Sequence, residues 1–136
     1  MPLMNETRSV LEQEFITAWG VTTPIAYDNV NFDDNNSSIT EYVEIRFVPY
    51  DTYNATMGDI LTRIEGALII AVFTRYGTGT GRAYELADLV DTNMTNKCYP
   101  PGITTRVSDT RRNGDTSEGW FGLLTSIPFV SDECRI

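Results

Sequence analysis

Residues 63–94, RIEGALIIAVFTRYGTGTGRAYELADLVDTNM, decide the fold, because an apolar strand passes through a glycine-rich turn into a helix. Apart from Glu65, residues 64–73 are apolar on both faces of an extended chain, with Ala67, Ile69, Ala71 and Phe73 on one face and Leu68, Ile70 and Val72 on the other. A strand of this kind must be covered on both sides. From Arg82 the period becomes helical, with one apolar stripe made of Ala83, Leu86, Ala87, Val90 and Met94. We expect this helix to lie on one face of a sheet.

Length and charge limit the class of protein. A chain of 136 residues is the size of one domain and can bury a core without a metal or disulfide staple. Its net charge of -9 argues against a general nucleic-acid binder, which needs a clustered positive field. The longest apolar run, residues 67–73, is too short to span a bilayer, and the N-terminal sequence is polar. We therefore expect one soluble domain over residues 1–136, made in a cytoplasm and without a membrane partner.

The sequence offers no catalytic or metal-binding constellation. The chain contains no histidine, and Cys98 and Cys134 have no CxxC spacing, so we expect free thiols and no zinc site. Asp28, Asp33 and Asp34 are acidic, but they lack the spacing of a calcium loop and are typical of a solvated loop tip. We predict a protein that is not an enzyme and has no cofactor.

The remaining segments predict further helix and strands. Leu11, Phe15, Ala18 and Trp19 recur at helical spacing near the N-terminus, and residues 42–48 alternate between apolar and polar side chains. Residues 103–107 alternate in the same way, Asn113-Gly114 is typical of a hairpin turn, and residues 119–130 form the return strand. The prediction is an α+β fold in the order α-β-β-α-β-β, with a twisted, mostly antiparallel or mixed sheet and two helices packed on one face. The apolar strand surface exceeds what two helices can cover, which predicts self-association.

The glycine-rich turn, YGTGTGRAYE, invites a second interpretation. A strand, a glycine loop and a helix N-terminus can together hold a phosphate. However, Gly77, Gly79 and Gly81 are spaced G-x-G-x-G rather than G-x-G-x-x-G, and no P-loop lysine follows. Arg82, in the first turn of the helix, opposes the helix dipole unless a negative group answers it. An anion- or nucleotide-binding domain stays open as an alternative, as does a monomeric protein-binding module.

Several segments resemble the tail terminator, or tail completion, proteins of long-tailed bacteriophages. These segments are LEQEFITAWG (11–20), TPIAYDNVNF (23–32), YVEIRFVPY (42–50), residues 64–90 and GWFGLLTSIPF (119–129). The resemblance implies a small α+β subunit that forms a hexameric ring, caps the tail tube, ends its polymerisation and presents a surface for head-tail joining. The implied partners are other copies of the chain, the tail tube protein and a head-completion or connector protein, with DNA passing through the ring without specific binding. The implied location is the head-proximal end of the virion tail, after assembly in the host cytoplasm.

Six residues are the candidates for interfaces of such a subunit. Arg106, Arg111 and Arg112 concentrate positive charge around one predicted hairpin of an acidic chain, either to keep a strand edge soluble or to reach an acidic partner. Arg82 could meet an anion, and Tyr27 and Asp28 lie in the PIAYDN segment that carries part of the resemblance.

Overall fold

The computed structural model describes residues 4–20, 22–27, 39–54, 61–75, 77, 80–100, 102–115 and 120–134, without the side chains of 113–115, 133 and 134. Asp28, the acidic stretch 33–38 and Gly79 therefore lie outside the described residues, and so does the side chain of Cys134. Cys98 is an exposed free thiol.

The described chain forms two helices and a seven-stranded mixed sheet, which confirms the α+β prediction. The order along the chain is α1 (Met4–Trp19), β1 (Ile25–Tyr27), β2 (Glu41–Asn54), β3 (Leu61–Arg75), α2 (Gly81–Met94), β4 (Cys98–Tyr99), β5 (Ile103–Thr105), β6 (Asp109–Asp115) and β7 (Trp120–Cys134). The strands lie in the order β1-β2-β3-β7-β5-β4, and β6 also pairs with β7. β1 and β2 are parallel, and the other pairs are antiparallel.

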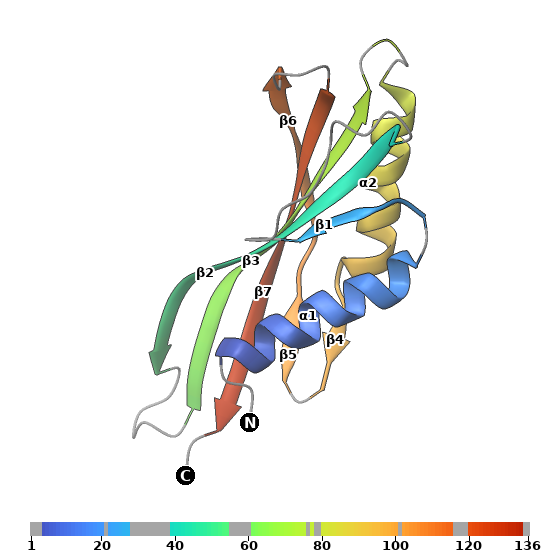
Figure 1. The fold of residues 1–136 in the computed structure, drawn as a ribbon. Coiled ribbons are helices and arrows are strands. Elements are labelled where there is room, and N and C mark those ends of the chain that lie inside the picture. The colour runs from blue at the N-terminus through green and yellow to red at the C-terminus, as the bar shows by residue number, and fades with distance from the viewer. Residues whose placement is uncertain are drawn as a thin grey trace.

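The strand that is apolar on both faces, β3, is central to the sheet. It pairs with β2 on one side and with β7 on the other over its full length, so that Leu68 lies between Phe47 and Ile127. The ends of β2 and β3 extend beyond α1, where β3 stays paired with the end of β7 (Figure 1).

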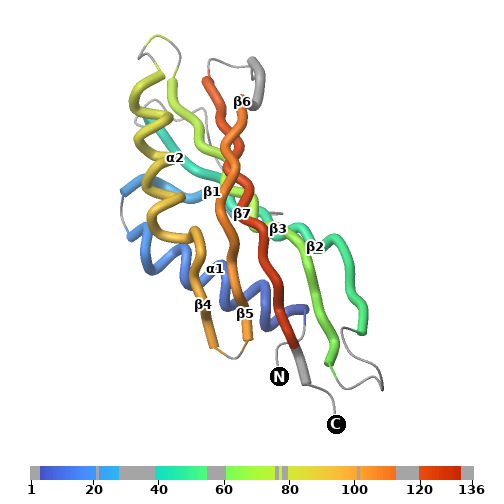
Figure 2. The backbone as a smooth tube through the Cα atoms, turned by 180° about the vertical axis from the view of Figure 1, so that it is seen from behind, coloured from blue at the N-terminus to red at the C-terminus, as the bar shows by residue number. Residues whose placement is uncertain are grey.

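Both helices pack on the same face of the sheet, as predicted (Figures 1 and 2). The helical stripes expected from the sequence are buried except for Ala18, which is exposed. The buried members are Leu11, Phe15 and Trp19 of α1, and Ala83, Leu86, Ala87, Val90 and Met94 of α2. They contact the strand side chains that point to this face of the sheet, including Val43, Leu68, Ile70, Val72, Leu123 and Ile127. This helix-covered face is the main core of the domain.

The opposite, helix-free face carries a smaller aromatic cluster of its own. Tyr42 stacks on Phe73 with ring centroids 4.8 Å apart and meets Trp120 edge-on at 4.9 Å. The Arg75 guanidinium lies 4.0 Å from the centre of the Trp120 ring. All three aromatic side chains are buried. The second apolar face of β3 is therefore covered at this end by neighbouring side chains of the sheet itself.

The second half of the sheet differs from the prediction at the hairpin. The strand expected at 103–107 ends at Thr105, and β6 continues through Asn113 and Gly114 to Asp115, so the predicted turn at these two residues is wrong. Arg112 pairs with Leu123 whereas Asp115 pairs with Phe121, so three steps along β6 match two along β7. An extra residue with a glycine is the signature of a β-bulge, which explains why Asn113-Gly114 bends the strand instead of ending it.

Candidate interaction surface

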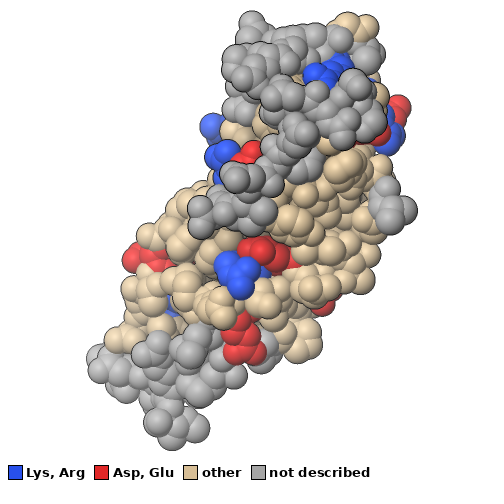
Figure 3. Space-filling model, viewed as in Figure 1, with Lys and Arg blue, Asp and Glu red and all other residues tan. Residues whose placement is uncertain are grey.

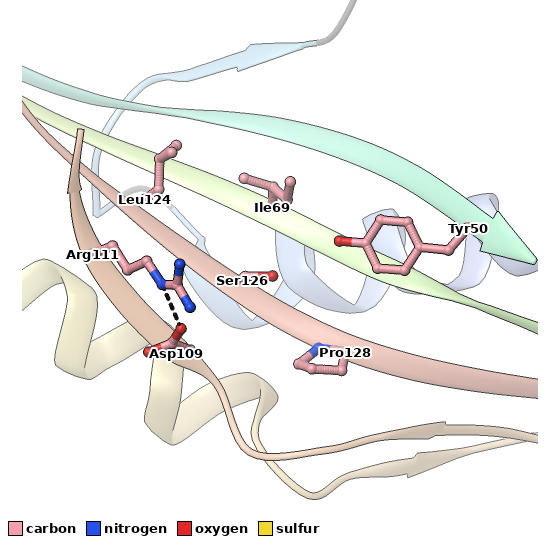
Figure 4. A pocket seen from close by; sticks show the side chains of 7 residues that line it. All are labelled: Tyr50, Ile69, Asp109, Arg111, Leu124, Ser126 and Pro128. Atoms are coloured by element: carbon pink, nitrogen blue, oxygen red, sulfur yellow. Dashed lines mark hydrogen bonds and ion pairs between the residues drawn. The ribbon is translucent and has the colours of Figure 1, made fainter. Parts of the chain in front are cut away.

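A hollow of about 350 Å³ lies on the helix-free face of the sheet. Its floor is formed by Ile69 of β3 and by Leu124, Ser126 and Pro128 of β7, and it is flanked by Tyr50 on one side and by Asp109 and Arg111 on the other (Figure 4). We call this hollow and its lining the helix-free groove. An apolar floor with polar and aromatic flanks is the arrangement expected of a contact with another molecule.

Tyr50 reaches the groove because of a break in the β2–β3 register. Pro49 pairs with Gly66 and Asp51 with Glu65, so Tyr50 is an extra residue without a partner on β3. Bulges of this kind re-aim a side chain. Tyr50 is 65% exposed, the largest exposure among the large apolar and aromatic side chains of the described residues. Tyr50 could not be singled out from the sequence, because the only local signal of the bulge is the proline beside it.

Below the groove, polar side chains join the three long strands. The Arg63 guanidinium donates to both carboxylate oxygens of Asp132, at 2.7 and 3.2 Å, and the Tyr53 hydroxyl donates to Glu65 at 2.9 Å. The hydrogen bond to Asp132 and a smaller interaction with Tyr53 raise the pKa of Arg63 above its ordinary value. These side chains are at least partly exposed, so the pairs set strand register more than they add stability.

The outer edge of β2 is closed to a further strand. Val43 donates its backbone N–H outward to Pro24, and the two-residue period of a strand then directs the backbone of Pro49 outward as well, where proline has no donor. Beyond the bulge, the backbone N–H of Thr52 is taken by the carboxylate of Asp51 at 2.9 Å. Proline, a bulge and a charged side chain are the usual defences of an exposed edge. A partner is therefore expected to contact side chains rather than this edge.

The side chain of Arg82 binds other side chains of the same domain. Its guanidinium donates to both carboxylate oxygens of Glu41 on β2, at 2.8 and 3.2 Å, and to Glu85 at 3.4 Å. The hydrogen bond to Glu41 raises the pKa of Arg82 above its ordinary value. Glu41 is thus the negative group that the position of Arg82 in the first helical turn requires. Thr80, the N-cap of α2, makes no side-chain capping hydrogen bond.

The three arginines of the predicted hairpin do not point the same way. Arg111 pairs with Leu124, lines the helix-free groove and donates to Asp109 at 2.8 Å. Arg112 is the next residue of β6, so its side chain leaves the other face and lies 5.0 Å from the centre of the Phe121 ring. Arg106 is exposed between β5 and β6. The structure gathers the three at one side of the sheet without joining them in one site.

Tyr27 lies at the end of β1 and is 40% exposed. It borders a second, more open hollow of about 410 Å³ with Ile16, Gly20, Thr23, Pro24 and Ile25. This hollow is separate from the helix-free groove, since the two share no lining residue.

The segment after β5 is fixed to the end of α2 by a carboxylate. Asp91 accepts hydrogen bonds from the hydroxyls of Ser108 and Thr95, and these lower the pKa of its carboxyl below the ordinary value. A depressed pKa contributes stability that is present above the unfolded-state value, near 4, and is lost as the pH falls below it.

We therefore expect Asp91→Ala to lower the free energy of unfolding by about 1 kcal/mol at pH 7, because two hydrogen bonds to a partly exposed charge are lost. Urea titrations at pH 7 and pH 3 should show that the difference from the unmodified protein shrinks at the lower pH. Asp88→Ala, three residues earlier on the same helix and exposed, is the control and should change stability by less than about 0.5 kcal/mol. A difference that grows as the pH falls would contradict the assignment.

The described residues show no other chemical centre. No group of three or more His, Cys, Asp or Glu side chains gathers among them, and none of the described helices is long and apolar enough to cross a membrane. On the side shown in Figure 3, the visible charged side chains form small separate groups, some of one sign and some in which both signs lie together. The described surface on this side therefore offers no extended field of one sign.

Comparisons with known proteins extend to the fold alone. No family model matches the chain, and no curated protein does. A solved structure that it resembles superposes with a TM-score of 0.69, at 16% sequence identity, over 99% of this chain and 100% of the other. Because the similarity covers nearly the full length of both chains, it places this protein in a class of small α+β domains. At 16% identity it carries no activity or partner to this chain.

Proposed function

We propose that this chain is the subunit of a ring, a homo-hexamer, that caps the tail tube of a long-tailed bacteriophage, ends tube polymerisation and provides the surface for head-tail joining. The observation that carries the proposal is the one-sided covering of the sheet. Both helices pack on one face, and the other face presents an apolar-floored groove with the exposed Tyr50 at its border. The sequence resemblance to tail terminator proteins supplies the biological setting.

In this proposal the partners are other copies of the chain, the tail tube protein and a head-completion or connector protein. The helix-free groove supplies one of these contacts. Tyr50 is suited to it, because an exposed tyrosine combines a large apolar surface with a hydroxyl and loses little conformational entropy when bound. The protein would lie at the head-proximal end of the virion tail, and DNA would pass through the ring.

The test combines mass with tail length. Native mass spectrometry should detect a species of about 92 kDa for six 15.3-kDa chains, alone or with added tail tubes, and tails assembled without the protein should be overlong. Tyr50→Ala should leave the melting temperature of the subunit within about 2 °C, because an exposed side chain stabilises the fold little, yet it should reduce ring formation or capping at least tenfold.

Tyr84→Ala is the matched control, because Tyr84 is 45% exposed on α2 and lies outside the groove. It should leave capping unchanged. Tails of normal length without the protein would overturn the function. Normal capping by Tyr50→Ala would remove only the assigned role of the groove.

The anion-binding alternative receives less support. Its candidate cation, Arg82, is already held by Glu41 and Glu85. A monomeric binding module would use the same groove, and the mass measurement distinguishes it from the ring subunit.

A further inference from the structure

The charge of the chain is unevenly divided. Residues 97–112 contain four of the ten basic residues and only one acidic residue, Asp109, which gives this stretch a formal charge of +3. Because the net charge of the whole chain is -9, the remaining residues together carry a formal charge of -12. In the fold, this stretch forms β4, β5 and most of β6, on the side of β7 away from β3.

Three cations of this stretch have no carboxylate partner among the described residues: Lys97, Arg106 and Arg112. The ion pairs of the described residues engage Arg8, Arg46, Arg63, Arg82 and Arg111. Lys97, Arg106 and Arg112 are all exposed. The three cations without a described carboxylate partner therefore give one side of the sheet an excess of positive charge.

The backbone holds these cations in place. Lys97 and Thr105 are joined by hydrogen bonds of 2.8 Å from the Lys97 N–H to the Thr105 hydroxyl and from the Thr105 N–H to the Lys97 carbonyl. The backbone N–H of Arg106 donates to the carbonyl oxygen of Pro128 at 2.8 Å, which fixes Arg106 against β7. Val107 lies beside Arg106 and is 63% exposed. An exposed apolar side chain among unpaired cations on a fixed backbone is suited to a protein contact.

We propose that this basic flank, made of Lys97, Arg106, Val107 and Arg112, binds an acidic surface of a second copy of the chain. The inference rests on the proposed ring and names the contact that joins its subunits. Because a contact of one flank with a different surface of the next copy is heterologous, it can close into a ring. The partner is a second copy because the rest of the chain carries -12, and its helices expose carboxylates outside any described ion pair: Glu6, Glu14 and Asp88. Arginine suits such a contact, since its planar group can pair with a carboxylate in bidentate fashion.

Lys97 makes the contact measurable, because it is the only lysine of the chain. Equal amounts of 15N-labelled and unlabelled protein are assembled and treated with a carbodiimide, which joins an amine to a carboxylate in contact with it. Mass spectrometry of the digested dimer band should show a peptide that joins Lys97 of one isotope to an acidic residue of the other. The yield should fall at least fivefold between 0.05 and 0.5 M salt, because screening weakens pairs at a surface.

Charge reversal tests the same contact independently. The double variant Arg106→Glu and Arg112→Glu should melt normally and lose at least tenfold in self-association, measured by sedimentation. The control, Arg8→Glu with Arg46→Glu, changes the net charge equally but reverses two cations that are paired within the chain and lie outside the groove, with Glu12 and Glu44 as their partners. It should retain self-association within about twofold.

Each other outcome is decisive. If hexamers form and cap tubes without an inter-subunit link to Lys97, the basic flank is not the contact, although the proposed function stands. The protein could instead retard duplex DNA in a gel-shift assay. If the double variant abolishes that DNA binding while hexamers persist, the partner of the flank is nucleic acid and the inference is overturned. A chain that stays monomeric at every concentration and on tubes, with tails of normal length in its absence, overturns both.

Discussion

Gly66→Ala should destabilise the subunit by about 3 kcal/mol or more, because the new methyl group has no space. A Cβ atom at this position would lie 2.4 Å from the carbonyl oxygen of Val48 and 2.8 Å from the Cα atom of Pro49. Both are backbone atoms of β2, directly beside the bulge that places Tyr50, so the two central strands would have to separate. Overpacking of a core costs about 1–3 kcal/mol where side chains can move, and here the backbone itself must move.

Thermal unfolding measures this effect, and a fall in Tm of about 10 °C or more is expected for a domain of this size. Gly81→Ala is the matched control, because a Cβ there meets nothing within 4 Å and the residue begins α2. It should be neutral or stabilising by up to about 1 kcal/mol, since alanine favours the helix over glycine. A loss below about 1 kcal/mol for Gly66→Ala would mean that β2 and β3 are not as close as described.

The main elements could be predicted from the sequence because each carries a periodic signal. The strand with two apolar faces required a central position, and β3 pairs on both sides. The stripes of α1 and α2 predicted which side chains would be buried, and all of them except Ala18 are. These signals lie within one segment of the chain, so they can be recognised without knowing which other segment packs against it.

Features that depend on strand register or on contacts between distant residues could not be predicted from the sequence. Asn113-Gly114 suits a turn and a bulge equally well, and only the register with β7 distinguishes them. Tyr50 lies just after the alternating stretch 42–48, and its exposure follows from its place as the extra residue between Pro49 and Asp51, which pair with adjacent residues of β3. The pairing of Arg82 with Glu41 joins residues 41 positions apart, so no spacing rule could find it.

The candidate surfaces were predicted in part. The concentration of positive charge at residues 106–112 was visible, but the sequence did not show that Arg111 is paired within its own strand while Arg106 and Arg112 are not. That distinction separates a solvated ion pair from cations that are free to bind a partner. The structure also adds Lys97 to the basic flank. This residue precedes the three arginines in the sequence, and the hydrogen bond of its backbone N–H to the Thr105 hydroxyl places it beside them.

Leu86→Ala should cost about 2–5 kcal/mol, because the Leu86 side chain is fully buried between α2 and the sheet. The loss combines the transfer of the side chain with the cavity that it leaves. Such a cavity collapses poorly here, since α2 is held at both ends: Arg82 binds Glu41 on β2, and Asp91 binds Ser108 after β5. We therefore expect a value in the upper half of this range, measured as the free energy of unfolding in urea.

Leu89→Ala on the same helix is the control, because Leu89 is 40% exposed and loses little apolar contact on truncation. It should cost less than about 1 kcal/mol, and its urea m-value should match that of the unmodified protein. Equal losses for the two leucines would show that α2 does not present Leu86 to the sheet. A loss below about 1 kcal/mol for Leu86→Ala would mean that the main stabilising contacts of the domain lie elsewhere than between α2 and the sheet.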